Sequence, residues 1–338
     1  MMGSSRVYDY AALNVPLEQA ANTRDLVSVQ DFSPEEIRSL FELTNIIKHR
    51  PADFRAALAG KQIVLFFEKA SLRTRLTFES GMASLGGNSM FFDQTRSRLH
   101  EREPLRDIAH NIERWVDAVV LRTYDHQTIV DMAEYAHIPV INALSDVEHP
   151  CQAFADFFTL QEKFGDLSRV RLAYVGDGNN VAHSLMLTAA SLGAKISIAT
   201  PAGYAPDPEI TAATLEIAAR TGGQLTITED PCEAVSGVDA IYTDVWASMG
   251  QEEETALRAK IFAAYKVTDA LMARAAAHSV FMHCLPAHRE QEVSTSVIDS
   301  PRAVVFDQSE NRMHVQKAIL LLLLGGGIRR FPSRSTHA

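Results

Sequence analysis

Short apolar segments alternate with amphipathic stretches along most of this chain. Runs rich in β-branched and aromatic residues, which predict strands, lie at 62–67, 89–92, 118–122, 139–142, 170–175, 195–200, 224–229, 240–245, 280–284 and 303–307. The stretches between these runs carry apolar residues at helical spacing. Strands that alternate with helices predict parallel sheets whose two faces are both covered.

A predicted helix at about 152–164 separates two series of these strands. Another helix begins at the sequence SPEE, where Ser33 is the cap, Pro34 lies in the first turn and Glu36 completes a capping box. The chain of 338 residues is long enough for two domains of ordinary size. We therefore expect an α/β fold of two doubly wound parallel-sheet domains joined by interdomain helices.

Composition narrows the class of protein. The formal charge is −10, from 42 acidic and 32 basic residues, so we expect neither nucleic acid nor a membrane surface as a partner. The longest apolar stretch, at 318–328, is too short to span a bilayer. Three scattered cysteines, and the lack of a signal-peptide core in residues 1–26, favour the cytoplasm. We interpret residues 1–26 as a leader or arm.

The first candidate site follows the strand at 62–67. In open parallel sheets, ligands bind beyond the carboxyl ends of the strands. There the sequence SLRTR, residues 71–75, begins a helix with Ser71 at the cap position. The free N–H groups of the first helical turn, with the side chains of Ser71, Arg73 and Thr74, suit a phosphate. A capped helix with solvated arginines is the alternative interpretation.

Further polar residues follow later strands of the first half. Arg122 ends the strand at 118–122, and a charge buried there needs a partner. That partner could be a ligand, and an ion pair with a carboxylate of the chain is the alternative. The sequence HPCQ, from His149 to Gln152, begins the helix between the domains. Its imidazole and carboxamide suit hydrogen bonds to a carbonyl and an amino group, although a helix cap and packing turn would use the same residues.

The second half contains a motif that imitates a dinucleotide-binding fingerprint. VGDGNN, residues 175–180, follows a predicted strand and begins a helix. Val181 stands where the third glycine belongs, and Thr200 stands where the fingerprint has an acid. Both departures from the fingerprint disfavour binding of NAD at this motif.

Two more strand ends carry reactive side chains. Asp244 is followed by a glycine-containing turn and suits a cationic amino group. Cys284 ends a later strand, where a thiol packed in the core is the alternative. A zinc site made of His283, Cys284 and His288 is disfavoured, because adjacent residues of a strand point to opposite faces.

These motifs together resemble the aspartate/ornithine carbamoyltransferase family over roughly residues 27–328. FEKASLRTRLTFE is similar to the family's carbamoyl-phosphate signature, and HPCQAFADFFTLQEKFG is similar to its hinge-helix motif. DVWASMGQEEE, HCLPAH and ENRMHVQKAI resemble the ornithine branch, since the aspartate branch has an HPLPR-like stretch where this chain has HCLPAH. The resemblance implies transfer of the carbamoyl group of carbamoyl phosphate to the δ-amine of ornithine, giving citrulline and phosphate in arginine metabolism. It implies no metal or organic cofactor.

The resemblance also implies roles for particular residues. Those matched to carbamoyl phosphate are Ser71, Leu72, Arg73, Thr74, Arg98, Arg122, His149, Gln152, Cys284, Leu285 and Arg312; those matched to ornithine are Asn180, Asp244, Ser248 and Met249. Asn179 is the alternative to Asn180. Cys284 and Asp244 would guide deprotonation of the amine, while Arg122 and His149 would stabilise the developing oxyanion.

A domain division and an assembly follow from the same resemblance. Residues 27–150 would bind carbamoyl phosphate and residues 151–312 ornithine, while a C-terminal helix at about 313–330 would return to the first domain. We expect a homotrimer or a multiple of trimers. The stretch RLHERE at 98–103 departs from the family's QLGRGE-like stretch, which reaches a neighbouring subunit, so intersubunit contacts are expected to differ.

Other functions stay open at this stage. Putrescine, N-acylated ornithine or aspartate would be alternative acceptors, an NAD-dependent dehydrogenase is an alternative enzyme, and a non-catalytic relative is a third possibility. Asp244 disfavours aspartate, the DVWASMG motif disfavours N-acylated substrates, and putrescine has no carboxylate for Asn180 to contact. The presence of every matched charged residue disfavours a non-catalytic relative.

Overall fold

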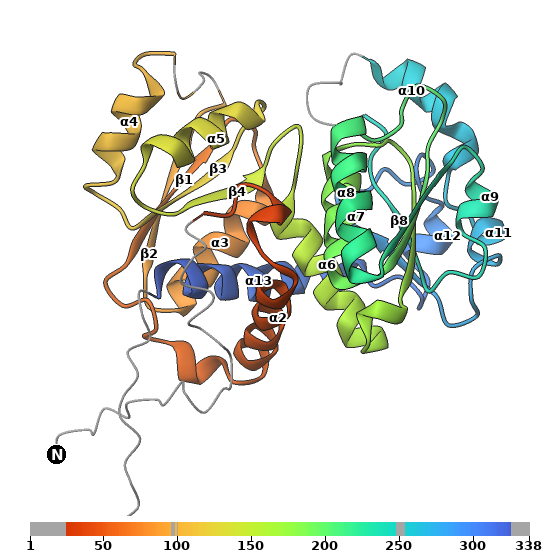
Figure 1. The fold of residues 1–338 in the computed structure, drawn as a ribbon, viewed down its shortest axis with the longest axis horizontal. Helices are drawn as coiled ribbons and strands as arrows, with labels where there is room; N and C mark the ends of the chain where they lie inside the picture. The colour runs from red at the N-terminus through yellow and green to blue at the C-terminus, as the bar shows by residue number, and fades with distance from the viewer. Residues whose placement is uncertain (1–24, 96–98, 100, 248–253, 326–338) are drawn as a thin grey trace, which may run out of the picture.

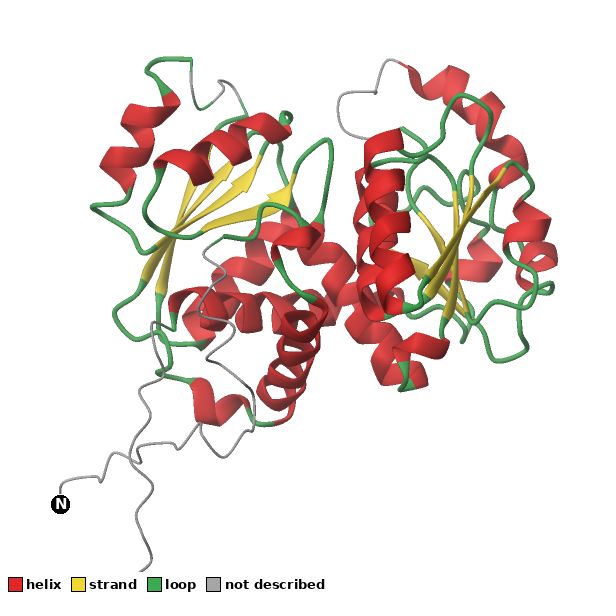
Figure 2. Cartoon of the chain, in the orientation of Figure 1, coloured by secondary structure: helices red, strands yellow, loops and turns green. Residues whose placement is uncertain are grey.

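The computed structural model describes residues 25–95, 99, 101–247 and 254–325. Figures 1 and 2 show two α/β lobes side by side, each with helices on both faces of its sheet. The strands are β1 (Gln62–Phe67), β2 (Asn88–Asp93), β3 (Ala118–Arg122), β4 (Val140–Leu144), β5 (Arg171–Val175), β6 (Lys195–Ala199), β7 (Gln224–Thr228), β8 (Ala240–Thr243) and β9 (Val280–His283). They form parallel sheets in the orders β2-β1-β3-β4 and β7-β6-β5-β8-β9. The predicted fold of two parallel-sheet α/β domains is therefore confirmed.

The helices alternate with these strands, as the apolar spacing predicts. They are α2 (Pro34–His49), α3 (Leu72–Ser84), α4 (Leu105–Ile112), α5 (His126–Tyr135), α6 (Pro150–Phe164), α7 (Asn180–Leu192), α8 (Pro208–Thr221), α9 (Pro231–Ala234), α10 (Thr255–Ile261), α11 (Asp269–Met272), α12 (Thr295–Ile298) and α13 (Val305–Leu324). The capping box of α2 is confirmed, because Glu36 N donates to Ser33 Oγ and Ser33 N donates to the Glu36 carboxylate. Within the described ranges, no helix combines the length and apolarity needed to cross a membrane.

The predicted strand at 303–307 is wrong. Ala303 forms a single isolated bridge to Phe281, and α13 begins two residues later at Val305. Val304 and Val305 are buried, so the apolar run that suggests a strand instead packs the start of a helix. A short apolar run does not distinguish these two structures by periodicity.

Helix α13 carries the end of the described chain back from the second lobe to the first. In Figure 1 it crosses beneath the first sheet and lies beside α2 and α3, and it packs against α6 as well. Val315, Ala318, Ile319 and Leu320 of α13 are fully buried in the core that also holds α2 and α6. The first lobe therefore depends on a segment far away in the sequence.

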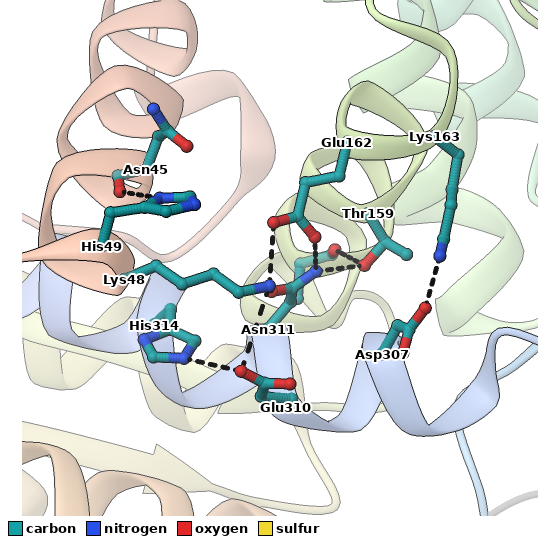
Figure 3. Close-up of polar contacts among 11 residues, drawn as sticks. Asn45, Lys48, His49, Thr159, Glu162, Lys163, Asp307, Glu310, Asn311 and His314 are labelled. Atoms are coloured by element: carbon teal, nitrogen blue, oxygen red, sulfur yellow. Dashed lines mark hydrogen bonds and ion pairs between the residues drawn. The ribbon is translucent and has the colours of Figure 1, made fainter.

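A polar network fixes how α2, α6 and α13 cross (Figure 3). Lys48 Nζ on α2 donates to Glu162 Oε1 on α6 and to Asn311 Oδ1 on α13, each at 2.8 Å. Asn311 Nδ2 in turn donates to Thr159 Oγ1 at 2.9 Å and to Glu162 Oε2 at 2.7 Å. Each partner is held by at least one of the others, so the three helices are joined at a single point.

A buried carboxyl group joins the two lobes just before α6. Glu148 is 1% exposed and accepts hydrogen bonds from Ser28 Oγ at 2.5 Å and Val29 N at 3.1 Å in the first lobe. It also accepts one from Ser184 Oγ on α7 in the second lobe, at 3.0 Å. Burial raises the pKa of Glu148 from 4.5 to about 7.

We predict that Glu148→Gln flattens the dependence of stability on pH. Because the pKa of Glu148 is higher in the folded state, its contribution to the free energy of unfolding falls as pH rises from about 4.5 to about 7. The shift corresponds to about 3 kcal/mol. Denaturant unfolding at pH 5 and pH 8 should therefore show a smaller loss of stability in the variant than in the wild type.

Glu290→Gln is the matched control. A hydrogen bond from Lys266 holds the pKa of the exposed Glu290 at about 2, so this carboxylate does not titrate between pH 5 and pH 8. Equal losses of stability in Glu148→Gln and wild type over this interval would contradict the assignment.

Candidate functional site

The candidate site lies at the points where each sheet reverses its winding. The reversals fall between β1 and β3 in the first sheet and between β5 and β8 in the second. Such switch points open a crevice at the carboxyl ends of the strands. The lobes also meet near here, because Asn180 Nδ2 on α7 donates to Ser145 O after β4 at 2.5 Å. His149 N adds a second contact, to Ser184 Oγ at 2.9 Å.

The start of α3 forms the first part of the site. Ser71 is the N-cap, as predicted, and its Oγ accepts a hydrogen bond from Thr74 N at 3.3 Å. Thr74 is buried, and its Oγ1 accepts a hydrogen bond from Arg312 Nη2 on α13 at 2.7 Å. Leu72 is 71% exposed, so its backbone N–H rather than its side chain is suited to a ligand at the helix start.

Two guanidinium groups stand beside this helix start, that of the buried Arg312 and that of the half-buried Arg122. Burial, together with the nearby charge of Arg312, lowers the pKa of Arg122 to about 10, which still leaves Arg122 protonated at neutral pH. Burial also lowers the pKa of Arg312. The Nε atoms of both arginines are buried without a hydrogen-bond partner among the described residues. Two neighbouring cations of this kind favour an anionic ligand.

His149 and Gln152 supply neutral hydrogen-bonding groups. Burial, reinforced by the charges of Arg312 and Arg122, holds the pKa of His149 well below its usual value, so its imidazole is neutral at pH 7. Gln152 Nε2 donates to Asp156 Oδ1 at 2.8 Å. This bond fixes the amide so that Oε1, which is buried and has no hydrogen-bond partner in the described part of the chain, is left as an acceptor.

Asp156 is a supporting residue that sequence reasoning missed. Besides Gln152, it accepts hydrogen bonds from Gln308 Nε2 at 2.9 Å and from Tyr242 OH at 3.0 Å. Burial raises its pKa to about 6. Gln308 Oε1 also accepts a bond from His283 N at 3.0 Å, which links α6 and α13 to β9. The available signal was an acid four residues after Gln152, on the same face of an otherwise apolar helix.

The second lobe brings three predicted residues together around one carboxylate. Cys284 Sγ donates to Asp244 Oδ1 at 2.9 Å, and Asn179 Nδ2 is 3.2 Å from Asp244 Oδ2. Asn179 also caps α7, because its Oδ1 accepts hydrogen bonds from the N–H groups of Val181 and Ala182. Of the two neighbouring asparagines, Asn179 therefore faces Asp244, whereas Asn180 points to Ser145.

The protonation state of Cys284 follows from its surroundings. Burial and the adjacent Asp244 carboxylate hold the pKa of the Cys284 thiol well above its usual value. The sulfur therefore keeps its proton at neutral pH and donates it to Asp244. A group in this state can orient an amine through a hydrogen bond, but it does not act as a thiolate base.

His283 and Glu292 are buried supporting residues; the sequence analysis considers His283 only as a zinc ligand and does not identify Glu292. Leu285 N donates to His283 Nδ1 at 2.9 Å, so the ring proton lies on Nε2, which is 3.2 Å from Glu292 Oε1. The imidazole thereby holds the backbone of Leu285, whose φ is +60°, in the left-handed region. The pair positions the chain segment that follows Cys284.

Strand alternation, the reason given for disfavouring a zinc site of His283, Cys284 and His288, does not apply to His283 and Cys284. Strand β9 ends at His283, so Cys284 lies beyond the alternating part of the chain. Potential ligand atoms of Asp244, His283 and Cys284 all lie within 4.8 Å of one another, a group that does not include His288. The predicted site residues Arg98, Ser248 and Met249 lie outside the described residues.

Comparisons with known proteins agree with this geometry. The family model of the aspartate/ornithine carbamoyltransferase carbamoyl-P binding domain matches residues 24–162, and that of the Asp/Orn binding domain matches residues 168–323. An ornithine carbamoyltransferase from Pyrococcus abyssi is 48% identical over 305 residues, which cover 90% of this chain and 96% of that protein.

Solved structures give the same result. An ornithine carbamoyltransferase from Pyrococcus furiosus has a TM-score of 0.87 and 47% identity, covering 90% of this chain and 98% of that one. An anabolic ornithine carbamoyltransferase from Campylobacter jejuni has a TM-score of 0.85 and 36% identity, covering 89% and 98%. With two family models that together match most of its length, this chain belongs to the aspartate/ornithine carbamoyltransferase family.

Proposed function

We propose that this chain transfers the carbamoyl group of carbamoyl phosphate to the δ-amine of L-ornithine and releases L-citrulline and phosphate. The observation that carries the proposal is the pair of arginines, Arg122 and Arg312, whose buried Nε atoms have no hydrogen-bond partner among the described residues, beside the start of α3. The similarity to ornithine carbamoyltransferases, one of them named anabolic, supports ornithine as the acceptor and arginine biosynthesis as the setting.

The phosphate binds at the start of α3. Ser71, Arg73 and Thr74, with the backbone N–H of Leu72, surround it, and Arg312 neutralises its charge from α13. Support comes from the bond between Arg312 and Thr74, which ties the cation to the helix end. This arrangement stabilises the charge that develops on the leaving phosphate.

The carbamoyl group lies between Arg122, His149 and Gln152. Arg122 and the neutral His149 hydrogen-bond the carbonyl oxygen, on which negative charge develops during attack. Gln152 Oε1, whose orientation is set by Asp156, accepts a hydrogen bond from the carbamoyl amino group. The backbone of Leu285 contributes from the second lobe.

Ornithine approaches from the second lobe. Asp244 and Ser248 hold its α-amino end, Met249 is a further contact of ornithine, and Asn180, or Asn179 in its place, contacts the carboxylate side. Cys284 directs the neutral δ-amine at the carbamoyl carbon. A C–N bond forms, the C–O bond to phosphate breaks with its electron pair, and the proton lost by the amine goes to the departing phosphate. Holding both substrates between the lobes supplies much of the rate.

Each half of the chain binds one of the two substrates. Residues 27–150, joined by the part of α13 that follows residue 312, hold carbamoyl phosphate, and residues 151–312 hold ornithine. The packing of α13 against α2 and α3 supports this division. The free thiols of Cys151, Cys232 and Cys284 support a reducing compartment such as the cytoplasm.

The active unit is a homotrimer. Support comes from the exposed apolar side chains of Leu72 and Leu76 on α3, beside the edge strand β2, whose Met90 and Phe92 are exposed on the face away from α3. A groove of about 350 Å³ lies between these elements and reaches Ser71. A neighbouring subunit seated there would bring its Arg98 segment to the phosphate.

The first test measures citrulline formation from carbamoyl phosphate, with ornithine, N-acetylornithine, putrescine and aspartate supplied in parallel. We expect turnover with ornithine alone, because Asp244 suits a free α-amino group. Preference for another amine would overturn the ornithine assignment and leave the phosphate site intact. Failure with all four, together with no binding of carbamoyl phosphate, would overturn the whole proposal.

A second prediction concerns Arg122. Arg122→Met should lower kcat by roughly 10²–10³-fold, because it removes a charged donor to the developing oxyanion. Arg289→Met is the control, since Arg289 is exposed and pairs with Asp299 at 2.7 and 2.8 Å away from the site. Steady-state kinetics of both variants decide the question. A kcat near that of the wild type in Arg122→Met would contradict the role given to this residue.

A third prediction concerns assembly. Leu76→Glu should dissociate the trimer, because it places a charge in the apolar face of α3, whereas Leu215→Glu on α8 should leave the trimer intact. Leu76 and Leu215 are both 50% exposed, so the two substitutions differ in location rather than in burial. Light scattering after size exclusion measures the mass. A wild-type monomer, or a trimer in both variants, would contradict the proposed interface.

A further inference from the structure

Two histidines and a glutamate face one another on the first lobe, outside the proposed active site. His110 and Glu113 lie at the C-terminal end of α4, and His137 lies in the connection between α5 and β4. His137 Nδ1 is 2.9 Å from Glu113 Oε2, and His110 Nδ1 is 3.7 Å from Glu113 Oε1. Each oxygen of one carboxylate therefore faces a different imidazole.

The groups are arranged for a shared ligand. The two imidazole rings are stacked, with centroids 6.2 Å apart and planes at 20°. Potential ligand atoms of all three residues lie within 4.8 Å of one another. Backbone and side chain of His137 both contact Glu113, since His137 N donates to Glu113 Oε2 at 2.9 Å. The carboxylate is thus held in place before any ion binds.

An ordinary ion pair explains only part of this arrangement. His278 and Asp239 form such a pair at 2.9 Å with a single imidazole. At Glu113 a second imidazole, that of His110 from the same helix end, approaches the remaining oxygen, and two protonated imidazoles there would repel each other. A divalent cation bound by neutral imidazole nitrogens and a carboxylate oxygen satisfies all three groups together.

We propose that His110, Glu113 and His137 form a binding site for a borderline divalent cation such as Zn²⁺. Two imidazoles and one carboxylate are ligands that Zn²⁺ takes in proteins, and a water molecule completes a tetrahedral shell. The His137 side chain is 75% exposed and that of His110 39%, so an ion reaches the site directly from solvent.

The position of the site indicates a structural role. Glu113 precedes β3 and His137 precedes β4, so the cluster lies at the amino ends of these strands. The reaction proposed above takes place at their carboxyl ends. A bound ion would join the end of α4 to the connection that follows α5, which stabilises the first lobe without touching the substrates.

The test is titration of the full chain with Zn²⁺ and with Co²⁺ in a Cys284→Ser background. This background removes the thiol of the Asp244, His283 and Cys284 group, which would otherwise compete for metal. We expect one equivalent of Zn²⁺ to bind, and Co²⁺ to give a visible d–d spectrum without a thiolate charge-transfer band. In the same background, His137→Ala and His110→Ala should each weaken Zn²⁺ at least tenfold.

His278→Ala is the matched control and should leave Zn²⁺ affinity unchanged, because it removes an exposed histidine from a carboxylate pair elsewhere. Thermal melts without metal establish that each variant is folded. If His137→Ala is not folded, His137→Gln is tested in its place. Saturating Zn²⁺ should raise the melting temperature of the background protein and not that of His137→Ala. Absence of saturable binding, or equal affinity in His110→Ala, His137→Ala and His278→Ala, would overturn the proposal.

Discussion

The structure depends on keeping two like charges, one buried and one half-buried, next to each other. Burial and the charge of Arg312 lower the pKa of Arg122, burial lowers the pKa of Arg312, and neither residue forms an ion pair among the described residues. Arg122 comes from the end of β3, whereas Arg312 comes from a helix that starts in the other lobe. To place both beside the start of α3, α13 must cross from the second lobe and pack through the core of the first. The long return of the chain is thus part of the site.

Buried acidic side chains offset part of the positive charge of these arginines. Asp156 is one example, since its charge opposes the lowering of the Arg312 pKa by burial while it accepts three hydrogen bonds. Those bonds come from α6, β8 and α13, so one carboxyl group sets the orientation of Gln152 and also joins both lobes. Glu148 likewise joins the two lobes through its hydrogen bonds, at the connection before α6. The electrostatic balance of the site and the relative placement of the lobes are therefore coupled through the same few residues.

The sequence predicts which residues lie at strand ends better than it predicts which buried polar residues support them. Ser71, Arg122 and Asp244 were identified because a parallel sheet collects the carboxyl ends of its strands at one edge. The start of α13 was missed because Val304 and Val305 look the same as a strand end or a helix start. Asp156, Glu292 and the supporting role of His283 were missed for a different reason. Their partners are brought close by tertiary packing alone, and nothing in local spacing indicates which buried polar residues will meet.

Protonation states then restrict the chemistry that the site can perform. His149 is neutral because burial and two arginines oppose its charge, and Cys284 keeps its proton because burial and Asp244 oppose a thiolate. Neither group is therefore a strong base at neutral pH, while both arginines remain cations. A site with these properties suits a reaction whose barrier falls when two reactants are aligned and when negative charge on a carbonyl oxygen and a leaving phosphate is stabilised. Acyl transfer from a phosphorylated donor needs both of these effects, which is why the geometry favours it over hydride transfer.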